Sequence, residues 1–146
     1  MFQGLATFLL LRDFLALDYF NAALRLQPYR YDIHYKVGMF YQSFQAFDEA
    51  IQAYNRALEI KPDHKTSLHN IAVIEVFRNS YEIAIAYFTK AIAADESYVE
   101  AYFGRAYCYE LIGDLVKSES DYRTSLMLDV KYLPSRKGMD RLKELK

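Results

Sequence analysis

The sequence predicts an all-α fold built from repeated helical hairpins. Three similar stretches recur along the chain: FLALDYFNAALRLQP ending at Pro28, FDEAIQAYNRALEIKP ending at Pro62, and YEIAIAYFTKAIAADE ending at Glu96. Glycine and proline are scarce, which suits helices joined by short turns. No run of alternating polar and apolar residues predicts a strand. The 146 residues are enough for one domain with a hydrophobic core.

The repeat has a period of 34 residues, and each of its columns keeps one class of side-chain size. One column holds small residues, at Ala16, Ala50, Ala84 and Ser118. An aromatic column follows four positions later, at Phe20, Tyr54, Phe88 and Tyr122. A second small column follows after three more positions, at Ala23, Ala57, Ala91 and Ser125. These offsets place the three columns on one face of a helix.

A second apolar stripe precedes these columns within each repeat. Between residues 31 and 64 it consists of His34, Val37, Gly38 and Tyr41. Two stripes separated by a short break indicate a helical hairpin. The small residues let the two helices approach closely, and the aromatic residue fills the gap beside them. We therefore expect Ala50, Tyr54 and Ala57 to be buried against the preceding helix.

Turn signals set the expected limits of the helices. Pro62 follows one helix because proline cannot continue it, and Gly113-Asp114 is expected to end one helix and cap the next. We expect helices near residues 1–11, 13–26, 30–43, 47–60, 64–78, 81–93, 98–111, 115–128 and 134–145. A single hairpin cannot bury its apolar face alone, so neighbouring hairpins must stack into a continuous core.

These columns resemble the tetratricopeptide repeat (TPR), a 34-residue helical hairpin. The best match lies between residues 31 and 64, through His34, Val37, Gly38, Tyr41, Ala50, Tyr54, Ala57 and Pro62. Four positions depart from the family pattern: His34 replaces the usual tryptophan, Glu75 the usual tyrosine, Glu96 the usual proline and Arg105 the usual leucine. The resemblance implies an α-α superhelix, a TPR solenoid of about four hairpins plus a C-terminal capping helix. We expect one domain over 1–146, with approximate repeats 1–30 (incomplete), 31–64, 65–98 and 99–132, and a cap at 133–146.

The two ends of the chain need separate interpretations. The first repeat lacks its opening four positions, so the chain is either a fragment of a longer array or has a shortened first helix. The apolar segment MFQGLATFLLL is too short to span a bilayer and lacks a basic leader and a cleavage site, so a packed terminal helix is expected. Near the other end, Met139, Leu142 and Leu145 share a helix face, and the basic residues around them predict a solvated cap.

Composition and motifs argue against catalysis and against a bound metal, cofactor or nucleic acid. The net charge is −1 and no basic stripe is present, whereas nucleic-acid binders usually carry a basic face. Cys108 is the single cysteine, so no internal disulfide and no cysteine-based metal cage can form. His34, His64 and His69 include no pair at i, i+4, and no phosphate-binding glycine loop or nucleophile motif appears. We expect a non-catalytic chain.

The TPR resemblance implies that the first helix of each repeat lines a concave groove for a protein or peptide partner. By that resemblance the groove residues are Tyr35, Met39, Gln42, His69, Val73, Val76, Phe103, Tyr107 and Glu110. Aromatic side chains at such a surface supply a large contact area at low entropic cost. The alternative interpretation is that several of these residues simply complete the core.

A TPR subclass binds the acidic C-terminal tails of chaperones with Lys, Asn and Arg on these same helices. One register places Met1, Leu5, Lys36, Thr66 and Asn70 at those positions, and the other places Tyr35, Met39, Asn70, Glu100 and Gly104. Neither register forms a cationic clamp. The sequence therefore predicts an adaptor that binds a different partner segment in an aromatic groove. The alternative is a self-association module that uses the apolar N-terminal helix, giving a homo-oligomer.

Overall fold

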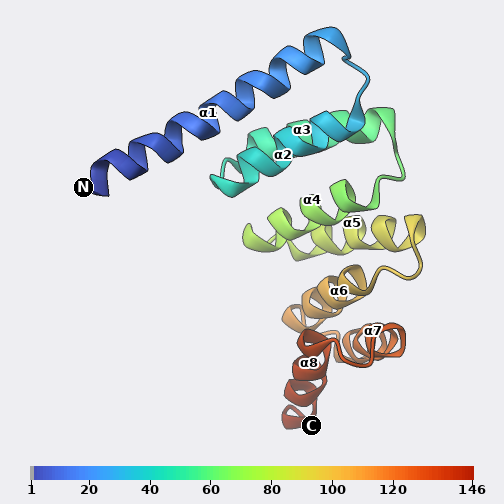
Figure 1. Cartoon of the computed structure of the whole chain (residues 1–146). Helices are drawn as coiled ribbons and strands as arrows, with labels where there is room; N and C mark the ends of the chain where they lie inside the picture. The colour runs from blue at the N-terminus through green and yellow to red at the C-terminus, as the bar shows by residue number, and fades with distance from the viewer. Residues whose placement is uncertain (1) are drawn as a thin grey trace. The chain divides into compact units, whose positions relative to one another are not determined.

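The computed structural model describes the backbone from Phe2 to Lys146 and the side chains from Leu11 onward (Figure 1). Within this part of the chain the fold is all-α, and no strand is present. Its helices are α1 (Phe2–Leu26), α2 (Tyr31–Ser43), α3 (Phe47–Ile60), α4 (Lys65–Phe77), α5 (Tyr81–Ala94), α6 (Val99–Leu111), α7 (Leu115–Leu128) and α8 (Leu133–Glu144). They form two compact units, the N-terminal unit (residues 1–62) and the C-terminal unit (residues 63–146).

In the N-terminal unit, α2 and α3 form the expected helical hairpin. The side chains of Ala50, Tyr54 and Ala57 are completely buried, which confirms the prediction from their spacing. The Tyr54 hydroxyl donates a hydrogen bond of 2.5 Å to Gln42 Oε1 on α2. A Cβ atom at Gly38 would collide with the Tyr54 ring, so glycine is needed where the two helices approach most closely.

The C-terminal unit repeats this packing in α4–α5 and α6–α7. The side chains in the three columns are again buried, at Ala84, Phe88, Ala91, Ser118, Tyr122 and Ser125. A Cβ atom at Gly104 would collide with the Phe88 ring, and one at Gly138 would collide with the Tyr122 ring. Phe88 and Tyr122 therefore each pack against a glycine on the helix that follows their own hairpin. Consecutive helices in this unit share one core through these contacts.

The turn inside each complete hairpin uses one residue with a left-handed backbone. These residues lie 34 positions apart, at Gln45 (φ 58°), Asn79 (φ 59°) and Gly113 (φ 85°). In the last turn, Gly113 N donates to Glu110 O and Asp114 N donates to Tyr109 O, the bonding pattern of a Schellman motif. Asp114 then caps α7 by accepting a hydrogen bond from Lys117 N at 3.2 Å, as the sequence predicted.

The first repeat differs from this pattern, and here the sequence prediction was wrong. We expected separate helices at 1–11 and 13–26, but the backbone forms the single helix α1. One period before Gln45, the turn column holds Leu11, and a branched residue strongly disfavours the left-handed conformation. Neither Arg12 nor Asp13 breaks a helix, so the helix continues through the predicted turn. The predicted packing of MFQGLATFLL lies outside the described side chains.

The final helix, α8, packs onto the C-terminal unit. Pro134 stands in its first turn, where the missing backbone N–H carries no penalty. Leu142 is buried and Met139 partly buried, whereas Leu145 is 62% exposed. The Ser125 and Ser135 hydroxyls are joined by a buried hydrogen bond of 2.7 Å, which ties α8 to α7.

Candidate functional site

An open pocket of about 600 Å³ lies in the C-terminal unit, and we call it the C-terminal pocket. Five of the predicted groove residues line it: His69, Val73, Val76, Phe103 and Tyr107. The first three lie on α4 and the last two on α6, because residues three to four positions apart share one face of a helix. The other residues of the wall are Phe77, Asn79, Tyr81, Phe88, Glu100, Gly104, Leu111 and Tyr132.

Aromatic rings in contact with one another form much of this wall. The rings of Phe103 and Tyr107 are stacked with centroids 6.3 Å apart, and Tyr132 meets Phe103 edge-on at 5.8 Å. His69 contacts Phe88 at 5.5 Å. Such contacts hold the rings in place before any ligand arrives, so binding would cost little side-chain entropy.

Two ionisable groups of the pocket are shifted by burial. Burial lowers the pKa of His69, against the opposing effects of a hydrogen bond with Asn70 and of the Glu100 charge. Burial raises the pKa of Tyr132, and the charges of Glu100 and Asp129 add to the effect. Both residues therefore favour their neutral forms near pH 7, which leaves Glu100 as the charged group of the pocket lining.

Two other predicted groove residues already have partners within their own hairpins. Gln42 accepts the hydrogen bond from Tyr54. Two periods (68 residues) later, Glu110 accepts a hydrogen bond of 2.6 Å from Tyr122. Glu110 also pairs with Arg141 of α8 through two contacts, at 2.8 and 2.9 Å. The intervening repeat has Phe88 and Val76 at these positions, so a polar acceptor occurs only where the aromatic residue carries a hydroxyl.

The Arg141–Glu110 pair adds a contact to the solvated C-terminal cap. The basic residues Arg136, Lys137, Arg141, Lys143 and Lys146 are exposed, as the sequence predicted, and Arg141 also reaches back to α6 and donates to the Tyr122 hydroxyl at 3.2 Å. The hydrogen bond from Arg141 lowers the pKa of the Glu110 carboxyl. Burial, aided by the hydrogen bond to Glu110, raises the pKa of Tyr122, so its hydroxyl stays protonated. This network anchors α8.

The remaining predicted groove residues, Tyr35 and Met39, lie on α2 in the N-terminal unit. The Tyr35 ring packs against the Tyr54 ring with centroids 5.9 Å apart, and Met39 is 47% exposed. Tyr35 therefore helps to complete the hairpin core, whereas Met39 is open to a ligand. Partner binding by these nine residues stays a prediction.

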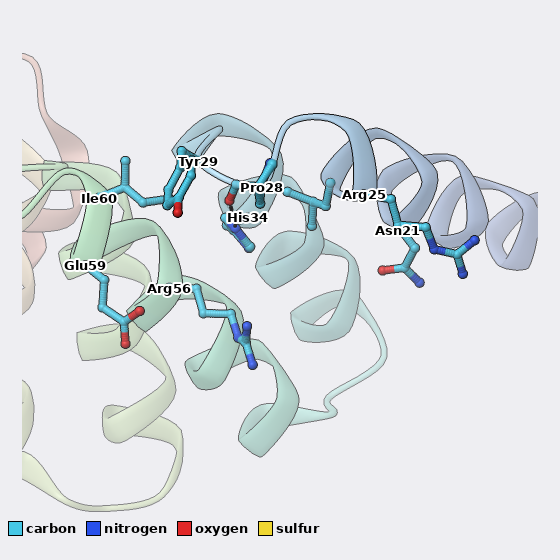
Figure 2. Close-up of a pocket in the computed structure, with 9 residues that line it drawn as sticks. Asn21, Arg25, Pro28, Tyr29, His34, Arg56, Glu59 and Ile60 are labelled. Atoms are coloured by element: carbon cyan, nitrogen blue, oxygen red, sulfur yellow. Dashed lines mark hydrogen bonds between the residues drawn. The ribbon is translucent and has the colours of Figure 1, made fainter.

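A second open pocket, of about 640 Å³, lies in the N-terminal unit between α1, α2 and α3 (Figure 2). The groups around it carry mixed charge, with Arg25, Arg56 and Glu59 all on its wall. His34, which also lines it, donates from Nε2 to the Pro28 carbonyl oxygen at 3.0 Å, and this bond holds the ring beside Pro28. The repeat pattern did not predict this pocket, because its charged residues lie outside the conserved-size columns.

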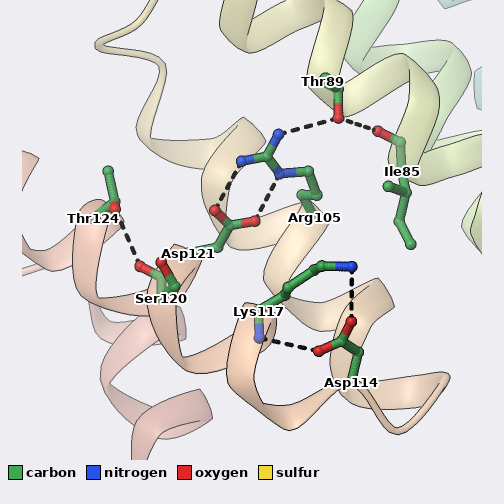
Figure 3. Close-up of polar contacts among 8 residues, drawn as sticks. All are labelled: Ile85, Thr89, Arg105, Asp114, Lys117, Ser120, Asp121 and Thr124. Carbon is green, nitrogen blue, oxygen red and sulfur yellow. Dashed lines mark hydrogen bonds and ion pairs between the residues drawn. The ribbon is translucent and has the colours of Figure 1, made fainter.

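Arg105, one of the departures from the TPR pattern, has a structural role (Figure 3). Its guanidinium makes two hydrogen bonds to Asp121 on α7, at 2.7 and 2.9 Å, and a third to Thr89 on α5 at 3.1 Å. The earlier repeats have Val37 and Ile71 in the column of Arg105. A part-buried ion pair thus stands where the earlier repeats have an apolar residue. With the Thr89 contact Arg105 joins three helices, so it is not a free cation for a ligand.

No feature of the described residues suggests catalysis. They contain no group of three or more His, Cys, Asp or Glu side chains arranged to hold a metal ion. Burial raises the pKa of Cys108 to about 12, so its thiol stays protonated and is a poor nucleophile. Among the helices described here, none has the length and apolar character required to cross a membrane.

Comparisons with known proteins agree with this geometry. Two sequence models described as tetratricopeptide repeat match residues 29–97 and 70–126, which together cover about two-thirds of the chain. The chain belongs to the TPR family. The curated relatives include mouse superkiller complex protein 3, which is 32% identical over 93 residues, and yeast heat shock protein STI1, 37% identical over 94 residues. The match to superkiller complex protein 3 covers 64% of this TPR chain but only 6% of that protein. The match to STI1 covers 60% of this chain and 16% of STI1.

Solved TPR structures share the fold at low sequence identity. The Arabidopsis OM64 TPR domain superposes with a TM-score of 0.76 at 20% identity, covering 80% of this chain and 96% of that one. MamA superposes with a TM-score of 0.79 at 16% identity, and the match covers 86% of this chain and 73% of MamA. The first TPR domain of Spaghetti (RPAP3), solved with the HSP90 peptide SRMEEVD, superposes with a TM-score of 0.76 at 20% sequence identity. The match covers 80% of this chain and 92% of that domain. The all-α repeat fold predicted from the sequence is therefore confirmed.

Proposed function

We propose that this TPR chain is a non-catalytic adaptor that binds a segment of a partner protein in the C-terminal pocket. The observation that carries the proposal is the pre-arranged aromatic wall around Phe103, Tyr107 and Tyr132 in an open cavity of about 600 Å³. Rigid aromatic side chains around a concave surface are typical of binding hot spots. The TPR structures solved with HSP90 and HSP70 peptides support a peptide ligand as the class of partner.

The adaptor is proposed to bind a segment other than the acidic chaperone tail. Glu100 and Gly104 stand on α6 where the clamp of that TPR subclass has cationic side chains. A carboxylate at such a position repels the acidic ligand instead of pairing with it.

The test is a comparison of partner capture by matched variants. Phe103→Ala with Tyr107→Ala should weaken the binding of captured partners about tenfold or more, because both rings would leave the wall. Tyr109→Ala is the matched control, since Tyr109 lies on the same helix outside the pocket lining. Each captured partner would then be measured by calorimetry, with circular dichroism used to confirm folding. Full binding by the folded double variant would reject the site.

The second candidate function is self-association through α1. Large apolar side chains on its described part are open to solvent: Leu11 is 58% exposed, Phe14 63% and Leu15 56%. Phe14 also borders a small apolar pocket of about 260 Å³ formed with Phe40 and Phe44. A second copy of the chain would bury this face. Light scattering should then detect a dimer that Phe14→Glu converts to a monomer, and a monodisperse wild-type monomer at high concentration would refute this candidate.

A further inference from the structure

Glu100 is a carboxylate without a cationic partner at the edge of an aromatic pocket. Among the described residues it makes no hydrogen bond and no ion pair. Three other carboxylates of the C-terminal unit do have cations: Asp95 pairs with Lys65, Asp121 with Arg105, and Glu110 with Arg141. The pocket lining itself contains no Lys or Arg. The charge of Glu100 is therefore available to a ligand.

The position of Glu100 joins this charge to the aromatic wall. Glu100, Phe103 and Tyr107 follow one another at i, i+3 and i+7 on α6, so they share one helix face that lines the C-terminal pocket. The Phe103 ring in turn contacts the Tyr132 ring. A cation bound beside Glu100 would therefore also meet ring faces, whose quadrupole attracts positive charge.

We propose that the C-terminal pocket selects a lysine or arginine side chain flanked by apolar residues in the partner segment. The ammonium or guanidinium group pairs with Glu100, its aliphatic stem lies along Phe103 and Tyr132, and the flanking apolar residues fill the space beside Val73 and Tyr107. Lys and Arg fit this arrangement because each combines a hydrocarbon stem with a charged end. This inference rests on the proposed adaptor function and adds the chemistry of the partner to it.

The geometry also argues against an anionic ligand at this place. An acidic side chain would face the Glu100 carboxylate in a pocket whose lining contains no Lys or Arg. Arg141, which lies over the Tyr107 ring at 5.9 Å, is already paired with Glu110. Neutral His69 cannot supply one near pH 7, because burial lowers its pKa. The exposed arginines of the chain's other large pocket, Arg25 and Arg56, belong to the N-terminal unit. An acidic partner segment that binds through them would count as evidence against this proposal.

The experiment is a selection of displayed random nonapeptides on the full chain. Wild type should enrich peptides with Lys or Arg next to aromatic or aliphatic residues. Glu100→Gln should abolish the basic preference, and Glu100→Lys should shift it toward Asp and Glu. Glu96→Gln is the matched control, since it removes the same charge from an exposed residue just before α6. For a selected basic peptide, fluorescence polarisation should show about three- to tenfold weaker binding to Glu100→Gln and unchanged binding to Glu96→Gln.

The outcomes separate this inference from the adaptor function. In one outcome, the enriched peptides show no preference for Lys or Arg, and their binding is lost in the double variant Phe103→Ala with Tyr107→Ala. This outcome would overturn the cation inference and leave the pocket as a binding site. Peptides that bind the folded double variant as well as wild type would overturn the proposed function itself. Enrichment of acidic peptides, reduced by Arg25→Ala with Arg56→Ala, would overturn both the site and the charge preference.

Discussion

Helices α1 and α3 of the N-terminal unit carry the same pattern of small and aromatic residues but bury it differently. In α3, Ala50, Tyr54 and Ala57 are completely buried. In α1 the equivalent residues are Ala16, Phe20 and Ala23, and all three are only partly buried. The pattern therefore defines a face that is able to pack, whereas burial requires a second helix folded back against that face.

The turn column explains why α1 has no such helix from its own repeat. Gln45, Asn79 and Gly113 each adopt a positive φ that reverses the chain, and Leu11 occupies the same column in the first repeat. A leucine in the left-handed conformation costs about 1–2 kcal/mol, which the continuous helix avoids. The residue in the turn column thus favours a straight helix in the first repeat. Five large apolar side chains on the described part of α1 remain exposed, at Leu11, Phe14, Leu15, Tyr19 and Leu26.

The largest expected effect on stability comes from replacing a residue of the aromatic column with alanine. Tyr54→Ala should reduce the free energy of unfolding by about 3–5 kcal/mol, because it leaves a cavity between α2 and α3. Phe20→Ala removes a partly buried ring of the same column and should cost about 1 kcal/mol or less. Urea unfolding followed by circular dichroism measures both values. Equal losses would show that α1 is as well packed as α3.

A smaller effect is expected from the turn column. Gly113→Leu should reduce the free energy of unfolding by about 1–2 kcal/mol, because leucine must then adopt the left-handed conformation found unfavourable in the first repeat. No atom lies within 4 Å of a Cβ built at Gly113, so the cost would come from the backbone and not from a collision. Gly113→Asn is the matched control, since Asn79 occupies this column in the preceding repeat. Unchanged stability of Gly113→Leu would refute the explanation given for α1.

The columns predicted the hairpins because they record a local property, the size of each side chain at a close helix contact. The continuous α1 was missed because a turn depends on one residue's backbone preference, and Gln45 and Asn79 are less obvious turn residues than Gly113. The Arg105–Asp121 pair was also missed. Its two members are 16 positions apart in different columns, so Arg105 alone looked like an isolated departure from the repeat.

The candidate site was predicted in part. The TPR resemblance selected the helix face, and helical spacing grouped Phe103 and Tyr107 on it; both line the C-terminal pocket, and their role in partner binding stays a prediction. The spacing did not reveal that Gln42 and Glu110 bond to tyrosines of the second helix, since this depends on side-chain reach between helices. Glu100 entered the sequence argument only as a residue unsuited to a cationic clamp for an acidic tail, and its lack of a cationic partner could be recognised only in the structure.

The smallest predicted effect is a pH dependence that distinguishes the C-terminal pocket from the rest of the fold. Burial lowers the pKa of His69 in the folded chain, so below about pH 6.5 the unfolded chain binds a proton that the folded chain does not. The free energy of unfolding should therefore fall as the pH decreases from 7.5 to 5.5, above the range in which carboxylates titrate. His69→Phe keeps the ring contacts with Phe88 and Tyr98 and removes the titrating group, so its stability should change less over this interval. Thermal unfolding of both proteins at the two pH values measures the difference, and an equal decrease in both would exclude His69 as its source.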